Sequence, residues 1–417
     1  MQKKRSIKII SVVLILVLIC ISITYLKNDS KVVLATKKEF NSENLQDNEH
    51  MHVEVDSTED KVPVPNGYVG SKATGENEID TGYVIYEGEE EVNDDNVEEA
   101  QKTRNQYVWI PVPDASTMYG TDANGKKWGK LYSFTTETGE EIDPVTGAKP
   151  LNWSESDGVY KITYFGITEP EVGAKVASIA VDMDSRIKTQ KLGSTDTHSF
   201  LAQLEQEFCK MIDSIQKYGG FYVGRYETGD LSKDKAVIRK FNQDIGSQTW
   251  YTMYNKCKKL SNENKNIETG IIWGNQRDRI LMWLIESGAK EKKDIATTSV
   301  NWGNYKDSEF EYLDSNEDNV LKSKDSEVRI PTGSAEFTKA NNIYDLAGNV
   351  SDLTMSVSNR LYKQYRGGNY QDKENSEIVT ASLGAYSYQA FKYMRLPCNV
   401  IYKVKQEIAN NFKKWNY

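Results

Sequence analysis

The sequence is poor in the residues that build metal and redox centres. Its 417 residues include only four cysteines and three histidines. No two cysteines have the CxxC spacing of a zinc or thiol–disulfide site. Cys20 lies in an apolar run, so Cys209, Cys257 and Cys398 allow at most one internal disulfide, and spacing leaves its pairing open. Proline and glycine, at 9 and 28 residues, are too few for a collagenous or low-complexity chain, so we expect most of it to fold.

Clustered positive charge is also missing after the first few residues. The formal net charge is -9 and the pI is about 5.2. Because nucleic-acid binding draws much of its affinity from clustered Lys and Arg, we expect no nucleic acid among the partners. Aromatic residues are plentiful instead. The 25 tyrosines and 8 tryptophans suit a mixed core or a recognition surface.

One long apolar run lies near the start of the chain. Residues 9–26 carry no charge and follow a basic segment. At 1.5 Å per residue this run reaches roughly 27 Å, which is close to the hydrocarbon thickness of a bilayer. We predict a retained signal anchor over residues 1–27 that spans the cytoplasmic membrane, with the C-terminal part outside the cell, because the positive flank stays inside. The alternatives are a cleaved signal peptide, although no small-residue cleavage site follows, and lipidation at Cys20.

The remaining chain divides into a tether and a domain. Residues 28–61 are polar and predict a flexible tether, and residues 62–417 predict a folded domain. The segments TGYVIYEG and NQYVWIPVP, near the start of that domain, have the composition of strands. The acidic stretch between them, EGEEEVNDDNVEEAQ, predicts a solvated loop.

Two later segments have the periodicity of helices. Apolar residues recur at three- and four-residue steps after Ser199, a candidate N-cap, and Gly219 with Gly220 provides a stop. The segment NQRDRILMWLIESG predicts a second helix that ends at Gly288. Short strands are expected at FYVGRYETG, QYRGGNY and KYMRLPCNVIYKV. This layout is α+β, and it lacks the alternating β and α units of a doubly wound sheet.

Five segments in order carry a resemblance to a known family. They are the first helix, FYVGRYETG, the second helix, NIYDLAGNVSDLT with YRGGNY, and the closing aromatic strand with Arg395. Together they resemble the formylglycine-generating enzyme, or sulfatase-modifying factor, domain over roughly residues 62–404. The resemblance implies a C-type lectin-like fold, with two helices around small twisted sheets and long loops. It is closest to non-catalytic surface or prophage-associated bacterial members.

The residues do not support the family's chemistry. Its copper site uses two cysteines shortly after the RGG element, but here the first cysteine after Arg366 is Cys398. Its iron-dependent relatives use three histidines, whereas His50 and His52 lie in the predicted tether and His198 at a helix start. We therefore expect no catalytic residues and no enzymatic activity. A divergent oxidoreductase of this family and a structural surface component are the alternatives.

The stretch NNIYDLAGNVSDLT corresponds in the family to a loop that wraps calcium. Carried over by position, the resemblance implies a structural Ca²⁺ site made by the side chains of Asp345 and Asp352 and the backbone carbonyls of Gly348 and Val350. Calcium accepts six to eight oxygen ligands, so these groups are chemically suitable. Ser351 and the residue after Asp352 depart from the family's tryptophans. The alternative is a turn in which the aspartates cap backbone amides.

The C-terminal aromatic region is the candidate recognition face, because the same region forms the exposed binding face in lectin-like folds. The partner would be an extracellular protein or glycan. The candidate contact residues are Arg366, Tyr386, Tyr388 and Tyr393. An alternative for Arg366 is structural, with Gly367 and Gly368 allowing close backbone packing and Arg366 bridging to a carboxylate.

Overall fold

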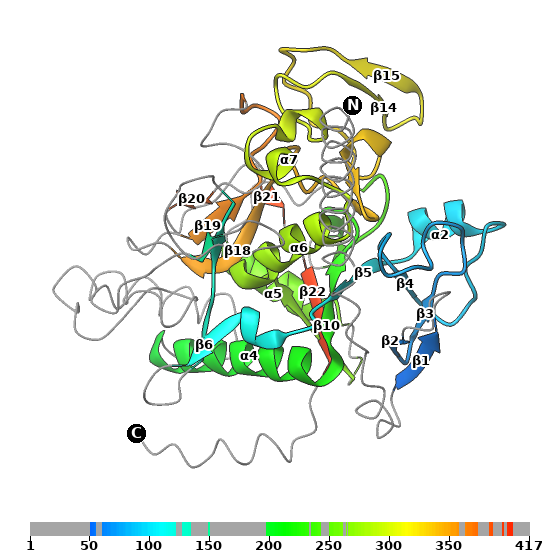
Figure 1. Ribbon diagram of the computed structural model, residues 1–417. Coiled ribbons are helices and arrows are strands. Elements are labelled where there is room, and N and C mark those ends of the chain that lie inside the picture. The colour runs from blue at the N-terminus through cyan, green and yellow to red at the C-terminus, as the bar shows by residue number, and fades with distance from the viewer. Residues whose placement is uncertain are drawn as a thin grey trace, which may run out of the picture. The chain divides into compact units, whose positions relative to one another are not determined.

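The computed structural model describes part of the chain (Figure 1). The described residues are 51–55, 61–121, 127–134, 149–150, 197–232, 235–242, 250–261, 264, 266–357, 363–373, 383–386, 394–395 and 398–402. They belong to one compact unit, Ser42–Tyr417. The predicted anchor lies outside them. Among the described residues, no helix has the length and apolar character needed to cross a membrane.

A six-stranded antiparallel sheet is the framework of this unit, with the order β13-β22-β10-β5-β4-β3. Its strands are β3 (Tyr68–Gly70), β4 (Val84–Glu87), β5 (Gln106–Pro111), β10 (Gly220–Gly224), β13 (Ile267–Ile271) and β22 (Cys398–Tyr402). The central strands β5 and β10 are almost wholly buried, and Trp109 of β5 lies opposite Tyr222 of β10. The strands predicted at TGYVIYEG, NQYVWIPVP and FYVGRYETG are confirmed as β4, β5 and β10.

A second, four-stranded sheet follows the order β20-β19-β18-β21. It contains β18 (Ser351–Val357), β19 (Lys363–Arg366), β20 (Leu383–Tyr386) and β21 (Met394–Arg395), and β21 is parallel to β18. The predicted strands near the C-terminus are confirmed as β19, β21 and β22. The mixed composition of antiparallel sheets and helices confirms the α+β class.

Paired short strands complete the described β structure. They are β1 (Met51–Val55) with β2 (Lys61–Pro65), β6 (Tyr119–Thr121) with β7 (Lys127–Gly129), β8 (Tyr132–Ser133) with β9 (Lys149–Pro150), β11 (Gly229–Ser232) with β12 (Lys235–Val237), β14 (Phe310–Leu313) with β15 (Asn319–Lys322), and β16 (Lys339–Ala340) with β17 (Ile343–Tyr344). β1 falls within the predicted tether. Its backbone pairs with β2, so regular structure begins before residue 62.

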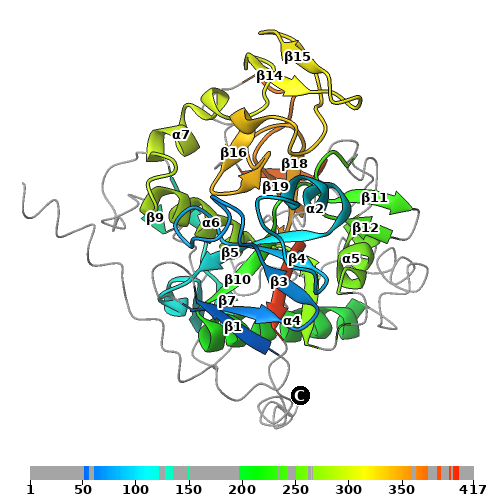
Figure 2. The same cartoon turned by 90° about the vertical axis from the view of Figure 1, so that its right-hand side faces the viewer.

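Three helices pack on the two sheets (Figures 1 and 2). α4 (Thr197–Tyr218) contacts β10 and β22, α5 (Trp250–Lys259) contacts β13, and α6 (Gly274–Glu286) contacts β5 and β18. The remaining helices are α2 (Val97–Thr103) and α7 (Lys292–Ala296), with single turns η2 (Ala115–Thr117), η4 (Ser299–Asn301) and η5 (Glu336–Thr338).

The two predicted helices are confirmed as α4 and α6. Gly219 and Gly288 follow them with φ of 74° and 76°, a backbone conformation that glycine adopts without strain. Ser199 lies inside α4, so its assignment as the N-cap is wrong. The expectation of only two helices is also wrong, because α5 was missed and α2 begins inside the acidic stretch predicted to be a loop.

Candidate functional site

Between residues 341 and 350 the regular structure is limited to the two-residue strand β17. Asn341, Asn342, Asp345 and Asn349 have φ between 44° and 61°, and Gly348 has a φ of 70°. Asn, Asp and Gly are the residues that adopt this left-handed region most readily. A side chain at Gly348 would also meet the Asn304 carbonyl oxygen at 2.3 Å. The residue types of the stretch therefore explain a backbone that turns tightly between neighbouring segments.

Asn349 and Glu227 join this stretch to the end of β10. The Asn349 Nδ2 donates to Glu227 Oε2 at 2.7 Å, and the Val350 amide donates to Glu227 Oε1 at 3.1 Å. The Asn349 Oδ1 accepts hydrogen bonds from Asn304 Nδ2 and the Ile330 amide. Both side chains are almost fully buried. The segments YETG and GNV thus form one hydrogen-bonded unit.

Asp345 is buried and accepts three hydrogen bonds. Its Oδ2 accepts from the Thr332 hydroxyl at 2.9 Å and from the Gly333 amide at 3.0 Å. Its Oδ1 accepts from the Thr338 hydroxyl at 2.7 Å. These bonds tie the stretch to the loop before η5. They match the alternative in which an aspartate of this stretch caps a backbone amide.

Asp352 and Arg366 belong to two adjacent buried ion pairs. Arg277 Nε donates to Asp352 Oδ2 at 2.9 Å, and Arg366 Nη2 donates to Asp278 Oδ1 at 2.7 Å. All four side chains are at most 1% exposed. Asp352 and Arg366 are register partners on β18 and β19, while their counterparts are consecutive on α6. The pairs therefore attach α6 to the four-stranded sheet, and Arg366 does bridge to a carboxylate.

These contacts do not suit a calcium ion at the predicted ligands. The Asp345 oxygens face hydrogen-bond donors, and a guanidinium lies against Asp352. Within the part of the chain that the structure describes, no group of three or more His, Cys, Asp or Glu side chains is placed to hold a metal. Calcium binding stays a prediction that chelation can test.

The predicted recognition face lies largely outside the described residues. Tyr386 ends β20, but its side chain, Tyr388 and Tyr393 are outside them. Arg366 is only 1% exposed, so it cannot contact a partner at the surface in this conformation. Among the cysteines that the structure describes, Cys257 is disulfide-bonded.

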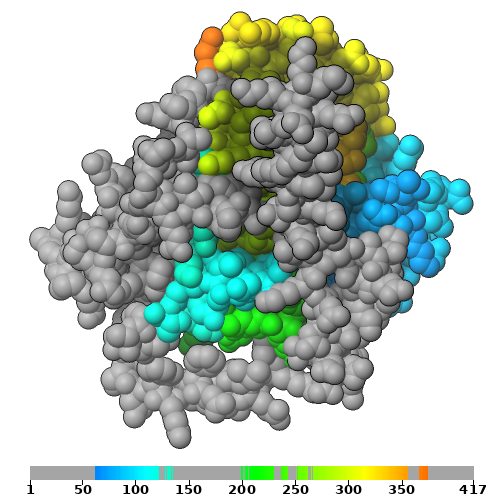
Figure 3. Space-filling view, in the orientation of Figure 1, coloured from blue at the N-terminus to red at the C-terminus, as the bar shows by residue number. Residues whose placement is uncertain are grey.

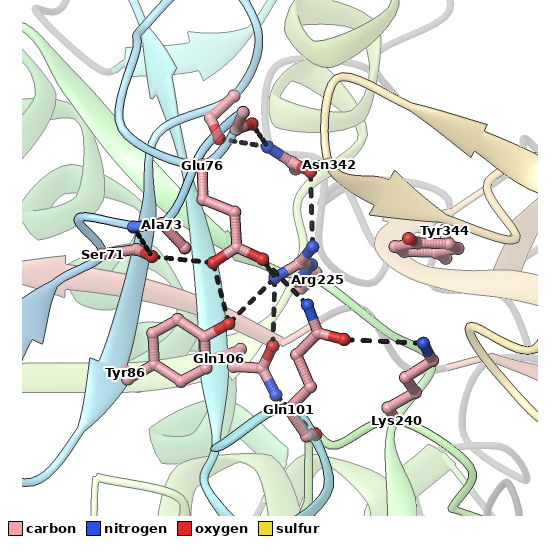
Figure 4. Close-up of polar contacts among 12 residues, drawn as sticks. Ser71, Ala73, Glu76, Tyr86, Gln101, Gln106, Arg225, Lys240, Asn342 and Tyr344 are labelled. Atoms are coloured by element: carbon pink, nitrogen blue, oxygen red, sulfur yellow. Dashed lines mark hydrogen bonds and ion pairs between the residues drawn. The ribbon is translucent and has the colours of Figure 1, made fainter. Parts of the chain in front are cut away.

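A second polar cluster surrounds Arg225, the residue after β10 (Figure 4). Its Nη1 donates to Glu76 Oε1 at 2.5 Å, to the Tyr86 hydroxyl at 3.1 Å and to Gln106 Oε1 at 3.2 Å. Its Nη2 donates to Asn342 Oδ1 at 3.3 Å. The side chain is 1% exposed, yet four segments distant in sequence converge on it.

The rings of Tyr226 and Tyr344 lie beside the Arg225 guanidinium, with its Cζ 5.4 and 5.7 Å from their centroids. Burial alone would lower the pKa of Arg225, but Tyr226, Glu76 and further tyrosines raise it above its usual range. Burial and the neighbouring Glu76 raise the pKa of the Tyr226 phenol, which is therefore neutral at physiological pH. Arg225 thus keeps its positive charge inside the protein.

Glu76 is the anionic partner in this cluster. Besides Arg225, it accepts hydrogen bonds from the Ser71 hydroxyl, the Tyr86 hydroxyl and Gln101 Nε2 at 2.8 to 2.9 Å. Burial opposes its charge, but Arg225 and these hydrogen bonds outweigh burial and lower the pKa of Glu76 below 4.5. Lys240 Nζ lies 3.5 Å from Gln101 Oε1 at the edge of the network. Glu76 is therefore ionised at neutral pH.

Asn342 fixes the loop that carries Glu76. Its Nδ2 donates to the carbonyl oxygens of Gly75 at 2.6 Å and Gly82 at 2.9 Å. A side chain at Gly82 would lie 2.0 Å from the Asn341 carbonyl oxygen. The close approach of the two loops therefore requires glycine at position 82, and it holds Asn342 against Arg225.

A cavity of about 180 Å³ opens beside this cluster, and we name it the Arg225 cavity. Most of its lining is polar or charged, and it comes from three regions of the sequence plus Arg225 itself. The lining residues are Ala73, Thr74, Gly75, Glu76, Asp94, Val97, Gln101, Arg225, Glu336, Lys339, Asn342 and Tyr344. Glu336 accepts from the Tyr344 hydroxyl at 2.5 Å and from Lys339 Nζ at 3.0 Å.

Sequence patterns did not predict this site. Arg225 lies in FYVGRYETG, which was interpreted as a strand and as one of the five segments of the resemblance, and Asp94 lies in the acidic stretch predicted to be a loop. The available signal was the position of Arg225, a charged residue directly after an aromatic strand that is buried. The lining contains no Cys, His or Ser, so it offers polar recognition in place of a nucleophile with a histidine base. No protein-family model matches the chain, and no curated protein matches it.

Proposed function

We propose that this chain is an extracellular binding domain without catalytic activity, held at the cytoplasmic membrane by residues 9–26, and that the Arg225 cavity is its ligand site. The observation that carries the proposal is the cavity of about 180 Å³, whose lining includes charged side chains held by hydrogen bonds. Buried charges are costly unless they are paired, and here Glu76 and Arg225 are paired and further hydrogen-bonded. The polar lining favours a small polar ligand of about monosaccharide size.

Preorganisation supports a binding role. The hydrogen bonds of Glu76, Asn342 and Arg225 hold the lining side chains in place before any ligand arrives. A ligand then loses its own freedom but does not need to order these side chains, which reduces the cost of association. Among the described residues, the exposed large hydrophobic side chain is Leu321, so this part of the surface favours polar recognition over an apolar docking face.

The extracellular placement is supported by chemistry as well as by the apolar run. Cys257 is disulfide-bonded, and disulfides persist mainly in oxidising compartments. The membrane anchor and the orientation rest on residues 9–26 and the preceding basic segment. The C-type lectin-like fold and the relation to the formylglycine-generating family stay part of the proposal, supported by the segment order.

The test is ligand-observed NMR on the full chain in detergent, with a panel of neutral sugars, amino sugars and amino-acid amides. Val97→Trp places a large side chain in the cavity lining, because Val97 is half-buried there at the start of α2. Val320→Trp makes the same change at a half-buried position of β15 that does not line the cavity. We expect saturable binding by the wild type and the Val320 variant, and loss in the Val97 variant.

Other outcomes would overturn the proposal. Absence of binding across the panel, or equal binding by both tryptophan variants, would remove the cavity as the ligand site. A divergent oxidoreductase would instead bind Cu(I) stoichiometrically and oxidise a cysteine-containing peptide. We expect neither reaction from the purified chain.

A further inference from the structure

The Arg225 cavity has one carboxylate without a cationic partner. Glu76 is paired with Arg225, and Glu336 with Lys339. Asp94 accepts hydrogen bonds from the Thr74 amide at 2.7 Å and the Thr74 hydroxyl at 2.9 Å. These bonds lower the pKa of Asp94 and keep it ionised. No cation pairs with it among the described residues, so the lining has a net negative charge.

The rim adjoining this carboxylate is strongly acidic. Eight of the thirteen residues from 87 to 99 are Asp or Glu, and none is basic. The seven from Glu89 to Glu99 are exposed. In Figure 3 blue and light-blue residues, the colours of this part of the sequence, lie on the surface at the right. A surface of one sign concentrates ions of the opposite sign near an adjoining cleft.

Arg225, which also lines the cavity, has an unused donor. Arg225 Nε is buried and makes no hydrogen bond with any residue that the structure describes. The two terminal nitrogens of the same guanidinium are bonded, as described above. A buried donor without an acceptor is energetically costly, by about 1–3 kcal/mol. An oxygen acceptor on a ligand would remove that cost.

We infer that the ligand of the Arg225 cavity is a small polar molecule with a primary ammonium group next to oxygen acceptors, the chemistry shared by amino sugars and peptide amino termini. This inference rests on the proposed function and specifies its ligand. The ammonium group pairs with Asp94, and the oxygen atoms lie on the Arg225 side of the lining. A neutral sugar would satisfy the donors but leave the Asp94 charge uncompensated.

The probes are glucosamine, glycinamide and glucose, titrated into the full chain in detergent at about pH 6, where amino groups with a pKa near 8 are protonated. Glucosamine and glycinamide distinguish an amino sugar from a peptide amino terminus. Glucose has the same ring as glucosamine without the ammonium group. We expect at least one amine to bind about twofold to fivefold more tightly than glucose, the scale of an ion pair at an exposed carboxylate such as Asp94.

Charge variants test the assignment in both directions. Asp94→Asn should weaken binding of the amine by about twofold to fivefold, whereas Lys339→Gln should tighten it because a nearby cation is lost. Glu309→Gln makes the same charge change as Asp94→Asn at an exposed position outside the lining, and it should leave the affinity unchanged. Added salt should weaken binding of the amine, since the acidic rim is screened.

The results separate this inference from the proposed function. If glucose binds as tightly as both amines and Val97→Trp still abolishes binding, the cavity is a ligand site but the ammonium assignment is wrong. If Asp94→Asn and Glu309→Gln weaken binding of the amine equally, Asp94 has no specific role and the inference fails. If no probe binds, or if Val97→Trp binds every probe normally, both proposals fail.

Discussion

Asp352→Ala tests the assignment of Asp352 as a structural ion-pair partner. The mutation leaves Arg277 fully buried without its carboxylate, because Arg277 and Asp352 are at most 1% exposed and joined at 2.9 Å. Removal of one partner from a buried pair typically costs about 3–5 kcal/mol. At roughly 2 °C per kcal/mol for a domain of this size, we expect the Tm to fall by about 6–10 °C.

The assay is thermal unfolding of the full chain followed by intrinsic fluorescence, with Asp80→Ala as a control at an exposed carboxylate. The double variant Arg277→Met with Asp352→Leu should recover part of the loss, because an apolar pair leaves no unpaired buried charge. If Asp352 is an ion-pair partner and not a calcium ligand, a chelator leaves the wild-type Tm unchanged. If chelation lowers the Tm by as much as Asp352→Ala, and added Ca²⁺ restores it, Asp352 is a calcium ligand and our reading of this pair is refuted.

Three further predictions concern Glu76, Gly348 and the membrane topology. The folded surroundings lower the pKa of Glu76, so its contribution to stability is complete above about pH 4.5 and is lost as the pH falls below that value. Glu76→Gln should therefore reduce the fall of the Tm at acidic pH. An unchanged fall of the Tm in this variant would contradict the assignment. Gly348→Ala should lower the free energy of unfolding in urea by more than about 2 kcal/mol, because a Cβ would clash with the Asn304 carbonyl and the backbone there is left-handed. An unchanged free energy of unfolding would contradict the tight turn at Gly348. Protease added to wall-free cells should cut residues 28–61 or the domain, whereas recovery of a soluble form that starts near Lys27 would indicate signal cleavage.

Local sequence patterns predicted the elements with strong periodicity. α4 and α6 were found because apolar residues recur over several turns and glycines end both helices. α5 was missed although Trp250, Met253 and Cys257 are buried at helical spacing. It has only ten residues, and aromatic, Thr and Asn residues in it have modest helix propensity. A short helix of this kind depends on packing against β13.

The candidate site could not be predicted because its contacts are distant in sequence. Glu76 and Arg225 are 149 residues apart, and Arg277 and Asp352 are 75 residues apart. The sequence showed the residue types of NNIYDLAGNVSDLT but not the donors that reach them. The same aspartates suit calcium or hydrogen-bond donors, and only the position of Arg277 and Thr332 distinguishes the two for Asp352 and Asp345.

The most direct test of the Arg225 cavity is a crystal structure of the chain with the probe that binds most tightly. We expect density for the probe between Asp94 and Arg225, with a hydrogen bond to the Asp94 carboxylate and the Glu76–Arg225 pair intact. Density at the C-terminal tyrosines, with the cavity lacking the probe at saturating concentration, would contradict the account.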